Sequence, residues 1–147
     1  MQMYLRIFED AAKVKCPIMS KRAGRRIDKM GLIIELKDAP LGPYFNSDIR
    51  NRMMMMVKVC QDYYPETLGN VYILNPPFIF YALFALVKPF LADATKEKIQ
   101  LIRGKDCDKL CRDLIEPEHL PEQLGGKLKI DHKKPYNYFE KYIKQCT

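Results

Sequence analysis

Apolar positions along the chain form short continuous runs, separated by longer segments with a helical period. Residues 31–36, 71–74 and 99–102 are rich in aliphatic and β-branched side chains and have the length of strands. The second run is apolar throughout and lies between turn residues, as expected of a strand buried on both faces. Apolar residues three and four apart predict helices over residues 5–15, 47–64, 78–87, 107–115 and 136–144. This alternation predicts an α/β fold with a mostly parallel sheet and flanking helices.

Local signals predict where the helices begin and end. Pro17 is expected to break the first helix, because proline interrupts the backbone hydrogen bonds of a helix interior. Asn46 or Ser47 is expected to cap the next helix, and Asp93 to cap a helical turn just before the strand at 99–102.

The segment 78–87 carries no charged residue, and the first charge after it is Lys88. A helix of this kind is buried in protein or faces lipid. It is far shorter than the roughly 20 residues that cross a bilayer. Two interpretations follow: the helix is central core, or one of its faces meets acyl chains, a membrane interface or a partner.

The composition is that of one soluble globular domain. The chain has 147 residues, of which 48% are hydrophobic and 29% charged, which is enough apolar surface for a core and is unlike a disordered chain. The first residues lead into a charged segment instead of an apolar signal sequence. A cytoplasmic protein is therefore expected.

Five cysteines without a secretory context favour reduced thiols. Cys107 and Cys111 are four residues apart and could share a helix face, but only His119 and His132 could join them as metal ligands. No paired metal-binding motif is present, so neither a metal nor a cofactor is expected.

The formal net charge of +7 is concentrated in two clusters. Such clusters suit an anionic phospholipid surface or nucleic acid, although a solvated helix face accounts for each single residue equally well. The N-terminal cluster lacks interleaved aromatic residues, so nucleic acid is not expected as a partner. The clusters are Lys13, Lys15, Lys21, Arg22, Arg25, Arg26 and Lys29, and Lys127, Lys129, Lys133 and Lys134.

The sequence gives little support for an enzyme. Ser20 and Ser47 are the only serines, and neither lies in a Gly-x-Ser-x-Gly motif. The chain also has no Gly-rich phosphate loop and no metal-binding motif. Hydrolysis and phosphoryl transfer are therefore not expected.

Several short motifs follow one another in the second half of the chain. They are Tyr63-Tyr64-Pro65-Glu66 with Gly69, Tyr72-Ile73-Leu74-Asn75-Pro76-Pro77-Phe78, Lys88-Pro89-Phe90-Leu91, Thr95, Lys98-Ile99, and Leu120-Pro121-Glu122-Gln123-Leu124-Gly125-Gly126. Together they resemble the second half of a CRAL-TRIO lipid-binding domain, and within that family the secretory-pathway phosphatidylinositol/phosphatidylcholine transfer proteins. The resemblance implies that residues 1–127 are the C-terminal part of such a domain and that residues 128–147 are a basic tail with a short amphipathic helix.

The resemblance implies that Glu66, Thr95 and Lys98 contact the inositol phosphate headgroup of a phospholipid ligand. Thr95 and Lys98 are three residues apart and share a face of a helical turn, where a hydroxyl and an ammonium suit phosphate oxygens. Glu66 can accept hydrogen bonds from inositol hydroxyls and help to place Lys98. Without the resemblance, Lys98 would be interpreted as ordinary solvated surface.

The apolar helix resembles the mobile gate of the family. The resemblance implies that Phe78, Phe80, Tyr81, Phe84 and Val87 line or close an apolar lipid pocket. The implied function is to take up phosphatidylinositol and to exchange it at Golgi or endosomal membranes from the cytoplasm, with no bond made or broken.

Two departures from the family pattern change this expectation. Met30 and Leu32 replace hydroxyl residues of the relatives that bind phosphatidylcholine, and neither side chain can hydrogen-bond a phosphate. A more hydrophobic second lipid is therefore conceivable. The helical bundle and strands that precede Leu5 in the family are missing, so an N-terminally truncated domain is expected. A protein partner or a second copy would then complete the pocket, or the chain would serve as a scaffold or regulatory binding module.

Overall fold

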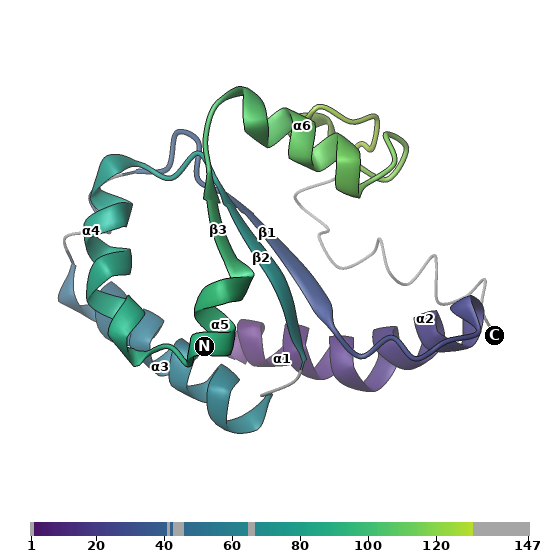
Figure 1. Ribbon diagram of the computed structural model, residues 1–147, viewed down its shortest axis with the longest axis horizontal. Helices are drawn as coiled ribbons and strands as arrows, with labels where there is room; N and C mark the ends of the chain where they lie inside the picture. The colour runs from purple at the N-terminus through teal and green to yellow at the C-terminus, as the bar shows by residue number, and fades with distance from the viewer. Residues whose placement is uncertain (1, 41, 43–45, 65–66, 131–147) are drawn as a thin grey trace. The chain divides into compact units, whose positions relative to one another are not determined.

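The computed structural model describes residues 2–40, 42, 46–64 and 67–130 (Figure 1). The chain divides into two compact units, with the boundary between Ile102 and Arg103. The first unit holds a parallel sheet with its helices, and the described part of the second holds one helix and a turn-rich segment. The predicted helix over residues 136–144 lies outside the described residues, as does most of the predicted tail.

The first unit confirms the predicted α/β fold. Its three strands are all parallel and lie in the order β1-β2-β3, with β2 in the centre (Figure 1). Each pair of neighbouring strands is joined by a helical crossover, which is the connection that parallel strands need. The elements are β1 (Met30–Glu35), α3 (Ser47–Tyr63), β2 (Leu68–Leu74), α4 (Phe78–Val87), the 3-10 helix η3 (Lys88–Phe90), α5 (Asp93–Lys98) and β3 (Ile99–Ile102).

Side chains on one face of the sheet form two apolar rows. In the first row, Val71 of β2 lies between Leu32 and Ile99, its partners in β1 and β3. Ile73 of β2 lies in the same way between Ile34 and Leu101. Phe80 of α4 packs against these rows. We call this surface the apolar sheet face; its residues are Leu32, Ile34, Val71, Ile73, Ile99 and Leu101.

The N-terminal helix does not break at Pro17, so that prediction was wrong. The chain passes from α1 (Gln2–Asp10) through five residues of π-helix, η1 (Ala11–Lys15), into α2 (Cys16–Ala23). Pro17 is in the first turn of α2, directly after the π-helix whose last bond runs from the Cys16 N–H to the Ala11 carbonyl. The missing N–H of Pro17 therefore falls where the hydrogen-bond register changes, and not inside a regular α-helix. The π-helix, a single wide turn, absorbs the change of hydrogen-bond register.

Of the two predicted helix caps, that of α3 is confirmed and that of α5 was wrong. The side chain of Asn46 accepts a hydrogen bond from the backbone N–H of Asp48 at 2.8 Å, which confirms the predicted cap of α3. Ala92 occupies the N-cap position of α5, so the predicted Asp93 cap was wrong by one residue. Asp93 is the first helical residue, and its carboxylate pairs with the Lys96 ammonium at 2.8 Å.

The described part of the second unit contains α6 (Lys105–Leu114), which confirms the helix predicted over 107–115, and a turn-rich segment. Cys107 and Cys111 are both buried on α6. A short 3-10 helix, η4 (Glu122–Leu124), and a β-bridge between Pro121 and Leu128 shape the turns. Within the described residues, no three metal-ligating side chains gather at one point. No helix among them has the length and hydrophobicity to cross a bilayer.

Candidate functional site

Lys98 lies at the end of α5 and reaches the beginning of the central strand. Its ammonium donates a hydrogen bond to the backbone carbonyl of Leu68 at 2.8 Å. Thr95 lies one turn earlier on the same helix, and both side chains are half-buried. Leu68 follows Glu66 by two residues in the chain, but Glu66 itself lies outside the described residues. The structure therefore brings the Lys98 ammonium to the first residue of β2.

Gln61 of α3 fixes the backbone that leads into α5. Its side-chain oxygen accepts a hydrogen bond from the backbone N–H of Ala92 at 2.9 Å. Its side-chain nitrogen donates to the carbonyl of Phe90 at 3.4 Å. Leu91, between these two residues, is buried. The segment that joins α4 and η3 to α5 is thereby held to α3, and Gln61 indirectly positions Thr95 and Lys98.

Tyr64, which precedes Glu66 by two residues in the chain, contacts helix α1. The Tyr64 hydroxyl donates to the Glu9 carboxylate at 2.5 Å, and its ring stacks on Phe8 with centroids 5.4 Å apart. Lys13 forms an ion pair with the same carboxylate. The hydrogen bonds from Lys13 and then from Tyr64 hold the pKa of Glu9 below its ordinary value. The hydrogen bond to Glu9 raises the pKa of Tyr64.

No pattern in the sequence pointed to Gln61 or to the pairing of Tyr64 with Glu9. Tyr64 was noted only as the end of the predicted helix over residues 47–64 and as part of the Tyr63-Tyr64-Pro65-Glu66 motif. Both contacts join residues far apart in the chain, separated by 31 and 55 positions. Glutamine and glutamate on helices are mostly exposed surface residues. The sequence therefore provides no reason to expect that Gln61 and Glu9 have partners far away in the chain.

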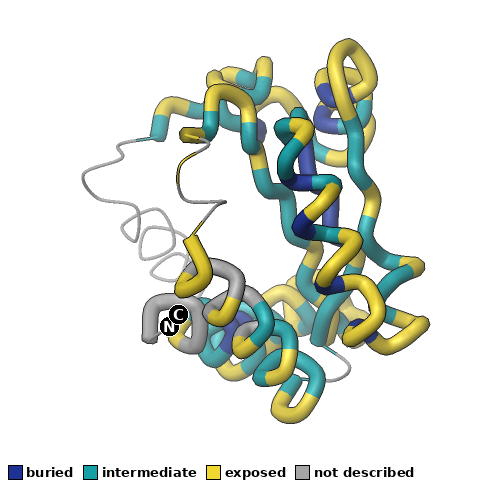
Figure 2. The backbone as a smooth tube through the Cα atoms, turned by 90° about the vertical axis from the view of Figure 1, so that its left-hand side faces the viewer, coloured by how far each residue is buried: buried dark blue, intermediate teal, exposed yellow. Residues whose placement is uncertain are grey.

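The predicted gate residues divide between two faces of α4. Phe80 and Val87 are buried and Tyr81 and Phe84 half-buried. Buried, half-buried and exposed positions alternate along the helical segments of the chain (Figure 2). The rings of Phe80 and Phe84 stack with centroids 6.2 Å apart. Phe78 instead is 85% exposed, because two helical residues are about 200° apart around the axis and Phe80 faces the sheet.

The outward face of α4 and η3 is also apolar. Besides Phe78, it exposes Leu86 (60%) and Phe90 (62%), and the small residues Ala82 and Ala85 are exposed as well. The two interpretations of this helix thus apply to different sides of it. One side is core, and the other is an apolar surface in contact with solvent, which is the kind of surface that marks interaction sites.

Residues 1–126 match the CRAL/TRIO domain family. The chain belongs to the CRAL-TRIO family. This confirms the resemblance that the spaced motifs indicated, and the parallel sheet with flanking helices is the fold of a solved relative. That relative, seen in the crystal structure of Sfh5, superposes with a TM-score of 0.51 at 28% identity, over 60% of this chain and 30% of that one.

Among curated CRAL-TRIO relatives, the Sec14 cytosolic factor of Schizosaccharomyces pombe is 31% identical over 126 residues, which are 86% of this chain and 43% of that protein. The phosphatidylinositol/phosphatidylcholine transfer protein SFH12 of Arabidopsis thaliana is 36% identical over 119 residues, 81% of this chain and 22% of that protein. The chain therefore spans less than half the length of these relatives.

Proposed function

We propose that this chain binds phosphatidylinositol and exchanges it at membranes without making or breaking a covalent bond. The observation that carries the proposal is the contact between Lys98 Nζ and the Leu68 carbonyl at 2.8 Å. It supports a headgroup site in which Thr95 and Lys98 of α5 lie next to the segment that contains Glu66. Family membership supports lipid binding in general, and the proposal adds the lipid and the residues.

The headgroup chemistry follows from the donors and acceptors of these three side chains. An ammonium carries three N–H donors, of which the Leu68 carbonyl accepts one. The others can donate to phosphodiester oxygens, together with the hydroxyl of Thr95. The carboxylate of Glu66 accepts from inositol hydroxyls. Choline offers no comparable hydroxyls, so this set of side chains favours inositol.

The acyl chains of the ligand would lie against the apolar sheet face beneath α4. Each methylene removed from water stabilises the complex by about 0.8 kcal/mol, so a lipid with two acyl chains needs such an enclosure to leave a bilayer. Phe80, Tyr81, Phe84 and Val87 would close it from the side of α4. The exposed apolar residues of α4 and η3 would contact the bilayer when lipid enters or leaves.

The resemblance implies that Met30 and Leu32 of β1 replace hydroxyl residues that contact phosphatidylcholine in other members of the family. Both are half-buried, and Leu32 belongs to the apolar sheet face. Since neither side chain can hydrogen-bond a phosphate, the second ligand would be a more hydrophobic lipid. We place the exchange at membranes that face the cytoplasm, Golgi or endosomal by resemblance.

The experiment that tests the proposal is native mass spectrometry of the protein after incubation with vesicles that contain phosphatidylinositol, followed by extraction of the bound lipid. The wild-type chain should carry one phosphatidylinositol, and a variant with Lys98→Ala and Glu66→Ala should carry none while keeping its circular dichroism spectrum. Lys96→Ala is the matched control, because Lys96 lies on the same helix but pairs with Asp93. Equal uptake by all three proteins would contradict the headgroup assignment.

A second candidate function is that of a non-catalytic scaffold or regulatory module built on a lipid-binding fold. It is favoured by the packing of Phe80 against the apolar sheet face, because this ring already fills part of the space that acyl chains would need. This candidate predicts a protein that is empty after purification and takes no phosphatidylinositol from vesicles. Uptake that appears only when a protein partner or a second copy is present would instead mean that the pocket is completed in a complex.

A further inference from the structure

A cluster of cations occupies the end of α2 and the turn that follows it. We call residues 21–26 the basic loop; four of its six residues are Lys21, Arg22, Arg25 and Arg26, and all four are exposed. Gly24 allows the turn, since its φ of 60° lies in the left-handed region. The proposed lipid site uses none of these residues.

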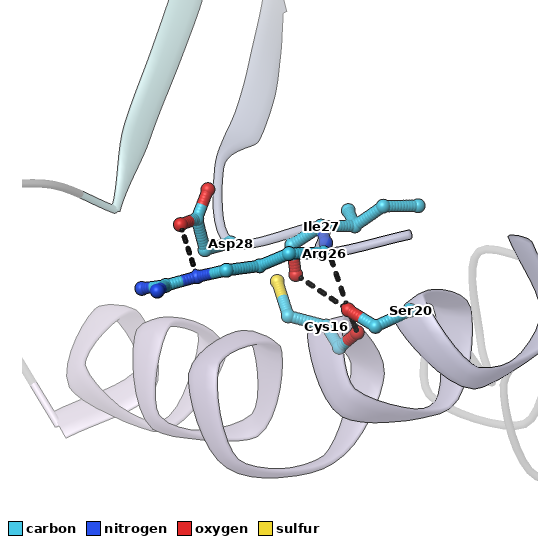
Figure 3. A network of polar contacts seen from close by, with 5 residues as sticks. All are labelled: Cys16, Ser20, Arg26, Ile27 and Asp28. Carbon is cyan, nitrogen blue, oxygen red and sulfur yellow. Dashed lines mark hydrogen bonds and ion pairs between the residues drawn. The ribbon is translucent and has the colours of Figure 1, made fainter. Parts of the chain in front are cut away.

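A hydroxyl group closes the basic loop at its base (Figure 3). Ser20 Oγ accepts a hydrogen bond from the backbone N–H of Ile27 at 2.8 Å. Its own proton is within donor distance of two carbonyls, that of Cys16 at 2.7 Å and that of Ile27 at 3.0 Å. These bonds hold the chain just before and just after the four cations, so the basic loop is ordered in the free protein. Binding of the basic loop to a partner therefore costs less conformational entropy than binding of a flexible segment would.

Most of the charge in the basic loop is not neutralised by neighbours. Arg26 pairs with Asp28, with Nε and Oδ2 2.8 Å apart. Lys21, Arg22 and Arg25 form no ion pair with any residue that the structure describes. Three unpaired cations within five positions of one turn therefore face solvent and attract a surface of opposite charge.

We propose that the basic loop docks the protein on an anionic phospholipid surface. Each Lys or Arg near such a surface strengthens binding about five-fold. Met19, directly before Ser20, is 48% exposed and offers an apolar side chain beside the cations, which suits the boundary between headgroups and acyl chains. This inference rests on the proposed function, because a protein that exchanges lipid must bind to the membrane from which it takes the lipid.

Nucleic acid is the competing polyanion, and the composition of this region disfavours it. No aromatic residue occurs between Cys16 and Met30, whereas proteins that bind single strands stack bases on aromatic side chains. The residues that adjoin the cations in the chain are Ser20, Ala23, Gly24 and Ile27, and none of them offers a ring on which a base could stack. A single-stranded oligonucleotide is therefore included in the test as the alternative ligand.

The test compares two variants with the same loss of charge. In the first, Lys21, Arg22 and Arg25 are replaced by glutamine. In the second, the exposed cations Lys105, Lys109 and Arg112 of α6 are replaced by glutamine. Sedimentation with vesicles of phosphatidylcholine, alone or mixed with phosphatidylserine, measures docking across a range of salt concentrations. Loading with phosphatidylinositol from detergent micelles is measured in parallel, because it needs no docking surface.

The expected result is binding of the wild-type chain to the mixed vesicles only, weakened by salt. The basic-loop variant should bind them roughly a hundred-fold more weakly, and the α6 variant should bind like wild type. Equal loss in both variants, no loss in the basic-loop variant, or binding of the oligonucleotide but not of the vesicles would overturn the proposal. Failure of wild-type loading from micelles would count against the proposed function alone and leave the docking result unaffected.

Discussion

The side-chain oxygen of Gln61 accepts a hydrogen bond from the backbone N–H of Ala92 at 2.9 Å, and this bond links helix α3 to the first residues of α5. Ala92 is the N-cap residue of that helix. Thr95 and Lys98 follow within six residues, so a change in the path of the chain at Ala92 is transmitted to both. Gln61 is in this sense a positioning residue for the proposed headgroup site.

Gln61→Met should loosen α5 and weaken phosphatidylinositol binding. Methionine has a similar length but cannot form either hydrogen bond, and each hydrogen bond contributes about 1 kcal/mol. Backbone amides of residues 92–98 should therefore exchange with deuterium several-fold faster in the lipid-free protein. Mass spectrometry of peptic fragments measures this exchange without any ligand.

Gln61→Glu is the matched control for that variant. A carboxylate keeps the acceptor for the Ala92 N–H, and it replaces the donor of the longer bond to Phe90 by an oxygen that cannot donate. Exchange should stay near that of wild type. If the glutamate and methionine variants exchange equally fast, the bond to Ala92 is not what orders α5, and the positioning role is lost.

The bond between Tyr64 and Glu9 should stabilise the fold only over a defined range of pH. The pKa of Glu9 lies below its ordinary value of 4.5 in the folded chain, so its contribution is complete above pH 4.5 and is lost as the pH falls through the lowered pKa. The pKa of Tyr64 lies above its ordinary value of 10.0, so its contribution is complete below pH 10.0 and is lost as the pH rises further. The stabilisation therefore spans the range between these two values.

Thermal unfolding of Glu9→Gln, Tyr64→Phe and the double variant, recorded by circular dichroism across pH, tests this range. Near neutral pH each single variant should melt below wild type, and the double variant should lose less than the sum of the two. In acid below pH 4.5 the gap between wild type and Glu9→Gln should narrow. A gap that does not change with pH would show that the carboxylate charge contributes nothing.

Sequence patterns predicted the elements of this fold better than its side-chain contacts. The helix at 78–87 and the strand at 99–102 were predicted with the bounds that the structure gives them, because uniform apolar runs between turn residues are local signals. Pro17 was misjudged because the rule for helix interiors assumes a regular α-helix, whereas the hydrogen-bond register here changes through a π-helix just before the proline. The partners of Gln61 and Tyr64 depend on the tertiary fold, which no local pattern encodes.

Replacement by alanine should change the free energy of unfolding strongly at Phe80 and very little at Phe78, although both residues belong to α4. Phe80 is 7% exposed and packs on the apolar sheet face, so Phe80→Ala should lower the free energy of unfolding by about 3–5 kcal/mol. Phe78 is solvent-exposed, so Phe78→Ala should change it by less than about 0.5 kcal/mol. Urea denaturation measures both values.

Phe78→Ala also tests whether lipid transfer depends on the outward face of α4 independently of stability. If the outward face of α4 meets the bilayer, Phe78→Ala should slow the transfer of a fluorescent phosphatidylinositol between vesicles while leaving the unfolding midpoint unchanged. Ala85→Ser, on the same exposed face, provides a small polar change as a comparison. Transfer by Phe78→Ala at the wild-type rate would argue that this ring takes no part in the encounter with membrane.

Gly126 should tolerate no side chain, because the turn-rich segment of the second unit closes tightly on it. A Cβ at this position would lie 1.9 Å from the backbone oxygen of Leu120, and Leu128 donates a hydrogen bond to that same carbonyl at 2.9 Å. Gly126→Ala should therefore cost more than about 2 kcal/mol and open residues 117–128 to deuterium exchange. Gly42→Ala is the control, since nothing lies within 4 Å of an added Cβ there, and it should behave like wild type. Protection of residues 117–128 that survives Gly126→Ala would mean that this segment has a second stable path.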